Sequence, residues 1–78
     1  MKYYLIEITT YNNGTNPAKA IYEFNSLDGE NSAMSSYYKK LGGSMDNPIY
    51  ATEMLMVIDS TGSVCAYNYF VRPVLVEE

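Results

Sequence analysis

The sequence has no histidine and only one cysteine, Cys65, among its 78 residues. Histidine is the usual general base near neutral pH and the usual partner of a serine or cysteine nucleophile, so most hydrolytic and acyl-transfer sites are excluded. The same shortage excludes the ligand spacings of zinc sites and any internal disulfide. We therefore expect a protein that is not an enzyme, with no catalytic, cofactor-binding or metal-binding residues.

Basic side chains are also few, with five Lys and Arg against nine Asp and Glu and a net charge of -4. Binding to a phosphate backbone needs clustered basic side chains, and the only adjacent basic pair is Lys39-Lys40. Direct nucleic-acid binding is therefore not favoured. The carboxylates are scattered too, whereas a protein that mimics DNA needs them dense.

Long apolar runs are missing. The run at Tyr3–Ile8 is broken by Glu7, and no stretch approaches the ~20 apolar residues that cross a membrane. We expect a single domain over residues 1–78, without membrane contact. A cytoplasmic location agrees with one reduced cysteine.

Residues 51–71 predict a β-hairpin. Two strands, Ala51–Ile58 and Val64–Val71, flank Asp59-Ser60-Thr61-Gly62-Ser63, which suits a type I turn with Gly62 in the left-handed conformation. With Asp59 opposite Ser63, the expected pairs are Ile58–Val64, Met56–Ala66, Met54–Asn68 and Thr52–Phe70 on one face, and Val57–Cys65, Leu55–Tyr67, Glu53–Tyr69 and Ala51–Val71 on the other. Both faces are largely apolar, so we expect both to be covered.

The rest of the chain completes a small α+β domain. Alternating residues predict strands at 2–10 and 18–24, separated by a turn-rich loop at 12–17. A helix is expected from an N-cap at Ser26, with Asp28 and Glu30 in its first turn, to about Asp46. Its apolar stripe comprises Met34, Tyr37, Tyr38, Leu41 and Met45. The predicted fold is a two-layer ββαββ arrangement, a four-stranded antiparallel sheet with one helix packed on one face.

One helix leaves the second face of the sheet uncovered. Its expected occupants, and hence the expected interface, are Tyr3, Leu5, Ile21, Leu55, Val57, Tyr67 and Tyr69, with Cys65 beside them, or the alternating set if the faces are reversed. A chain this short buries little surface by itself, and tyrosine suits interfaces. We therefore expect a homo-oligomer or a protein partner at this face.

The cysteine, one pair of carboxylates and the tyrosines can each be interpreted as structural or as functional residues. Cys65 lies in a strand without a basic neighbour, so a packed, inert thiol is preferred to a nucleophile. Glu7 and Glu53 fall on one face, where a solvated or paired role is preferred to acid–base chemistry. The nine tyrosines are explained by strand preference, with a pocket for a small planar ligand as the alternative.

Three segments, Lys2–Ile8, Tyr37–Met45 and Met56–Val64, carry a resemblance that spans most of the chain. Together they resemble short uncharacterised phage and prophage proteins of gut Firmicutes, often encoded among virion-morphogenesis genes; the chain differs from that pattern by extra residues around Asp28–Ser32. The resemblance implies a phage-type setting, in the host cytoplasm or on the virion, and transfers no functional residue.

Two classes of function follow. The first is a non-catalytic interaction module, a virion or assembly accessory, that associates through the uncovered sheet face. The second is an anti-defence accessory protein that inhibits a host enzyme or sequesters a nucleotide-like signal in a tyrosine-lined pocket.

Overall fold

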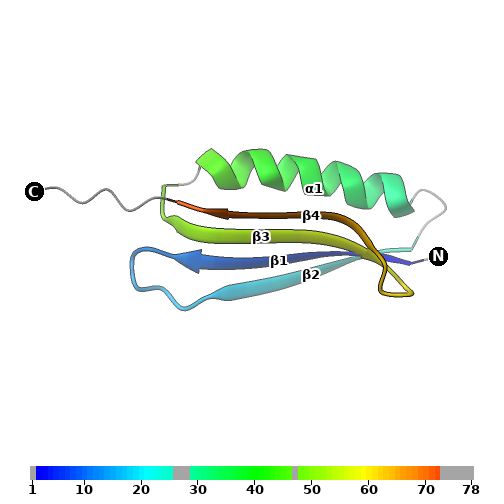
Figure 1. Cartoon of the computed structure of the whole chain (residues 1–78), viewed down its shortest axis with the longest axis horizontal. Coiled ribbons are helices and arrows are strands. Elements are labelled where there is room, and N and C mark those ends of the chain that lie inside the picture. The colour runs from blue at the N-terminus through cyan, green and yellow to red at the C-terminus, as the bar shows by residue number, and fades with distance from the viewer. Residues whose placement is uncertain (1, 26–28, 47, 73–78) are drawn as a thin grey trace, which may run out of the picture.

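The chain folds into a four-stranded antiparallel sheet with one helix, as the sequence predicts (Figure 1). The computed structural model describes residues 2–25, 29–46 and 48–72. The elements are β1 (Tyr3–Tyr11), β2 (Ala18–Phe24), α1 (Gly29–Asp46), β3 (Tyr50–Asp59) and β4 (Val64–Val71). The strand order, which the sequence leaves open, is β2-β1-β3-β4.

The predicted element bounds hold to within one residue for the strands. The bounds of β2 and β4 match, whereas β1 is displaced by one residue from the predicted 2–10 and β3 extends one residue further at each end. The described part of the helix begins at Gly29 and ends at Asp46, the predicted last residue. The predicted N-cap, Ser26, and Asp28 lie outside the described residues, as does the side chain of Met45.

Helix α1 runs lengthwise along one side of the sheet and contacts β3, β1 and β2 (Figure 1). Because β2 and β3 both pair with β1 in the antiparallel sense, they run parallel to each other, and α1 is the crossover between them. Strand β1 lies between the two strands that α1 connects.

The core lies between α1 and the sheet. It consists of Leu5, Ala33, Tyr37, Leu55 and Val57. Tyr3, Phe24, Met34, Leu41 and Ala66 pack around it.

The buried stripe of α1 differs in part from the predicted one. Tyr37 is 6% exposed, as expected of a core residue, but Tyr38 is 63% exposed and is not part of the stripe. Ala33, four residues before Tyr37 and on the same side of the helix, is buried instead of Tyr38. Its small side chain lets the helix approach the sheet closely.

The predicted turn of the second hairpin is confirmed. The Gly62 amide donates to the Asp59 carbonyl at 3.0 Å, the Asp59 amide donates to the Ser63 carbonyl at 3.0 Å, and Gly62 has a φ of 89°. Ile58 lies opposite Val64, also as predicted. The hairpin therefore begins in the expected register.

Beyond that first pair, the predicted register is wrong by one residue. Val57 pairs with Ala66, so Cys65 is an extra residue in β4, which makes a β-bulge. The bulge places Tyr67 opposite Met56 and Tyr69 opposite Met54, in place of the predicted Leu55 and Glu53. Because side chains alternate along a strand, this shift places each β4 side chain from Ala66 onward on the face opposite to the predicted one.

None of the helices among the described residues is both long and apolar enough to cross a membrane.

Candidate functional site

The side of the sheet away from α1 is the candidate functional site, and we call it the open face. Of the residues that the structure describes, none packs over it. Alternation from the buried Leu5, Leu55 and Val57 assigns its apolar members as Tyr4, Ile6 and Ile8 of β1, Ile21 of β2, Met54, Met56 and Ile58 of β3, and Val64, Tyr67, Tyr69 and Val71 of β4.

These side chains are accessible to different degrees. Ile21, Tyr67, Tyr69 and Val71 are each at least 52% exposed. The open-face residues of the two central strands are half-buried by their neighbours, apart from Ile8, which is 38% exposed. Isolated exposed apolar residues are normal on a protein surface, but here they are adjacent across four strands. The open face is thus one continuous apolar surface.

Charged side chains gather at one margin of the open face. Lys19 and Glu23 lie on β2, where Glu23 accepts an exposed salt bridge from Lys2 at 3.0 Å. The open side of β3 and β4 has only Thr52 as a polar residue besides its tyrosine hydroxyls, and none of its described side chains is charged. The apolar character is strongest over β3 and β4.

The size of the open face follows from strand geometry. Four strands spaced by about 4.8 Å and about seven residues long at ~3.3 Å each give a footprint of roughly 450 Å². Patches of this size on monomers often mark binding sites. The largest apolar patch on a typical monomer covers about 300–600 Å², so this footprint is of ordinary size for a patch. It is small for a complete interface, which buries about 800 Å² per partner.

The predicted interface residues divide between the two faces. Ile21, Tyr67 and Tyr69 lie on the open face. The prediction was wrong for Leu5, Leu55 and Val57, which are fully buried beneath α1, and for Tyr3, which packs against that core.

Two physical reasons explain this division. The bulge at Cys65 moves Tyr67 and Tyr69 to the face of Met54 and Met56, away from Leu55. The helix also covers the face that carries Glu7, Thr9 and Glu53, which sequence patterning does not favour for a core. The residues missed on the open face are Tyr4, Ile6, Ile8, Met54, Met56, Ile58, Val64 and Val71. Apart from Val71, which the bulge moves together with Tyr67 and Tyr69, they belong to the alternating set, which the β-period alone already distinguishes.

The polar residues beneath α1 are paired. Glu53 is fully buried, and its carboxylate accepts a 2.9 Å hydrogen bond from the Thr9 hydroxyl. Glu7 accepts from the Lys40 ammonium at 3.5 Å. The two carboxylates do share a face, as the sequence suggests, and their partners give both a structural role.

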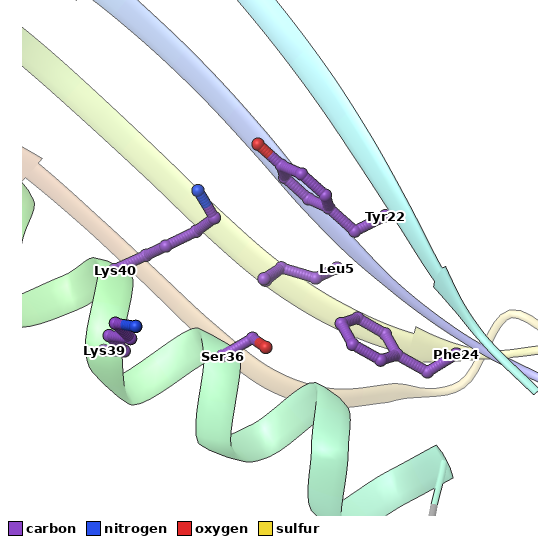
Figure 2. A pocket seen from close by; sticks show the side chains of 6 residues that line it. All are labelled: Leu5, Tyr22, Phe24, Ser36, Lys39 and Lys40. Atoms are coloured by element: carbon purple, nitrogen blue, oxygen red, sulfur yellow. The ribbon is translucent and has the colours of Figure 1, made fainter. Parts of the chain in front are cut away.

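A groove of about 570 Å³ lies between α1 and β2. Figure 2 shows Ser36, Lys39 and Lys40 on the helix side, Tyr22 and Phe24 on the strand side, and Leu5 between them. The Lys40 ammonium lies 4.6 Å from the centre of the Tyr22 ring. Desolvation would lower the pKa of Lys40, but the Tyr22 hydroxyl and the Glu7 carboxylate outweigh it and raise that pKa, so Lys40 stays charged.

Cys65 is exposed, in contrast to the packed thiol expected from its place in a strand. The bulge takes it out of the regular ladder. Partial desolvation, then the carboxylates of Asp59 and Glu30, raise the pKa of the thiol, which disfavours the reactive thiolate. Within the described ranges, no three or more acidic or cysteine side chains gather as metal ligands would.

Comparisons with protein families, with curated proteins and with solved structures found no significant match.

Proposed function

We propose that this protein is a non-catalytic interaction module that self-associates through the open face of its sheet. The observation that carries the proposal is the continuous apolar surface over β3 and β4, where none of the described side chains is charged. Burying such a surface removes apolar area from water without burying an unpaired charge.

The occupant that we propose is a second copy of the chain, and its net charge restricts which surfaces of two copies can meet. Each copy has a net charge of -4, so two copies repel each other wherever their charged surfaces meet. They approach at least cost through a surface without charges, and the open side of β3 and β4 is such a surface. Two sheets that pack face to face, about 10 Å apart, form a sandwich with the helices on its outer sides.

The test of this interface places a charge at its centre. Met56→Glu introduces a carboxylate on the open face, and we expect a lower oligomeric mass than that of the wild type in native mass spectrometry. Tyr38→Glu is the matched control, because Tyr38 is 63% exposed on the helix, away from the sheet. Circular dichroism checks that both variants are folded. An unchanged mass for folded Met56→Glu contradicts the proposal.

The biological setting of the module rests on the sequence resemblance to short phage and prophage proteins. In that setting, a small self-associating protein without a catalytic site suits an accessory role in virion assembly. Association with purified virions tests this role, with immunoblotting of gradient-purified particles as the measurement. A protein confined to the unpackaged fraction contradicts it.

A second candidate function is supported by the groove between α1 and β2. Its two lysines and two aromatic rings flank an apolar floor at Leu5, a combination that suits a planar anionic molecule such as a nucleotide. Lys39 is exposed, whereas Lys40 is already paired with Glu7. An anti-defence accessory protein that sequesters such a signal is the corresponding function.

An NMR titration separates this function from self-association. AMP is the probe and adenosine is the uncharged control. We expect AMP to shift the amide signals of Ser36, Lys39 and Lys40 more than adenosine does, and Lys39→Gln to weaken the effect. Equal shifts with both compounds, or shifts confined to the open face, count against this ligand class.

A further inference from the structure

The two outer strands of the sheet differ in how their edges are protected. Edge strands expose unpaired amide and carbonyl groups, and proteins commonly blunt them with charged residues or proline. Strand β2 follows Pro17 and contains Lys19 and Glu23. Strand β4, with the sequence VCAYNYFV, has neither a charge nor a proline over its eight residues. The bulge at Cys65 interrupts this edge near its start, and Arg72-Pro73 follows β4 in the sequence, so it is residues 66–71 between them that lack the usual protection against pairing.

The backbone of β4 presents a regular row of groups at that edge. The Arg72 amide donates to the Ala51 carbonyl of β3 at 2.8 Å. Because successive residues of an antiparallel strand direct their amide and carbonyl groups to opposite sides, Tyr67, Tyr69 and Val71 direct theirs away from β3. Of the strands among the described residues, none pairs with that side of β4.

We propose that β4 pairs with β4 of a second copy, in the antiparallel sense, across a two-fold axis perpendicular to the sheet. A self-complementary strand pair of this kind is a closed, isologous interface. Without charged side chains on β4, no like charges are brought opposite each other in the pair. The inference goes beyond the proposed function, because it concerns the edge of the sheet and holds whatever covers the open face.

Edge pairing has a consequence for the open face. A two-fold axis perpendicular to the sheet keeps both helices on one side, so the two open faces join into one surface of roughly 900 Å². This surface reaches the ~800 Å² per partner of a standard interface, which a single open face does not. Combined with the proposed face-to-face packing, the two interfaces give a tetramer with two eight-stranded sheets in its centre.

The test isolates the edge by working in the Met56→Glu background, in which the open face carries a charge. There we expect a dimer by native mass spectrometry. Adding Tyr69→Pro removes an amide that faces the edge, without removing a bond to β3, and we expect the mass to fall by half. Adding Tyr69→Thr is the matched control, since it also removes the ring but keeps the amide, and we expect the dimer to persist.

Two results overturn the inference: a monomer in the Met56→Glu background, or a folded Tyr69→Pro variant that remains a dimer. If the proline prevents folding, amide hydrogen exchange measured on the single variant Met56→Glu tests the edge pair instead. Slow exchange at Tyr67, Tyr69 and Val71 supports the edge pair, and exchange as fast as in the Asn12–Asn16 loop overturns it. The proposed function is judged separately, from whether Met56→Glu lowers the mass of the wild type.

Discussion

Single residues beneath the helix show how this small core accommodates polar groups. Glu53 is fully buried, and a buried carboxylate costs free energy unless hydrogen bonds replace its water. The Thr9 hydroxyl, itself buried, supplies one such bond from the directly opposite position on β1. The pair joins the two central strands through their side chains as well as their backbones.

Removing this hydroxyl tests its contribution to stability. We expect Thr9→Val to lower the free energy of unfolding by about 1–3 kcal/mol, because the buried Glu53 carboxylate loses the hydrogen bond from Thr9 while the side-chain volume is conserved. Thr9→Ser keeps the hydroxyl and is expected to retain most of the stability. Urea unfolding followed by circular dichroism measures both, and equal losses for the two variants would point to packing of the Thr9 methyl group instead.

Adjacent tyrosines on α1 distinguish its buried side from its exposed side. Tyr37 is 6% exposed and packs in the core, whereas Tyr38 is 63% exposed and contacts the Tyr37 ring edge to face at 5.2 Å between centroids. We expect Tyr37→Ala to cost about 3 kcal/mol and Tyr38→Ala less than about 1 kcal/mol. Thermal unfolding of the two variants provides the measurement, and the reverse order would mean that the helix packs through a different side.

The β3–β4 hairpin is organised by one carboxylate in its loop. Asp59 accepts hydrogen bonds from the Thr61 hydroxyl at 2.6 Å, the Thr61 amide at 2.9 Å and the Ser63 amide at 3.1 Å. The Thr61 hydroxyl contributes most to lowering the pKa of Asp59, and the backbone amides add to it. The loop is therefore held best when Asp59 is ionised.

This lowered pKa predicts a pH dependence. A carboxyl whose pKa is lower in the folded state stabilises the fold above its usual pKa, and that stability is lost as the pH falls through the folded value. We expect wild type to be more stable than Asp59→Ala at neutral pH and the difference to shrink below about pH 4. Unfolding curves of both proteins across this range check it; a constant difference would mean that the charge of Asp59 has no part in stabilising the loop.

At the scale of the whole molecule, net charge and apolar surface oppose each other. Each copy has a net charge of -4, while the open face and the β4 edge carry apolar groups suited to association. Charge repulsion between copies is long-range and is screened by salt, whereas apolar burial is not. The dependence of assembly on ionic strength should therefore show whether charge repulsion or apolar burial dominates.

We expect salt to strengthen self-association. Raising NaCl from about 0.05 M to about 0.5 M screens the repulsion between like-charged copies and leaves the apolar contact intact, so the dissociation constant should fall. Analytical ultracentrifugation at the two salt concentrations measures it. A weaker assembly at high salt would indicate an interface held by opposite charges, contrary to the uncharged surfaces proposed above.

Local sequence determined the elements of this protein, and the tertiary structure decided which surfaces they expose. Strand alternation, the turn at Asp59–Gly62 and the helical stripe are local properties, and they predict the ββαββ order and most element bounds. The bulge at Cys65 and the choice of face for α1 depend on contacts distant in sequence, which periodicity does not contain. One extra residue in β4 therefore sufficed to place Tyr67 and Tyr69 on the open face while Leu55 and Val57 were buried beneath the helix.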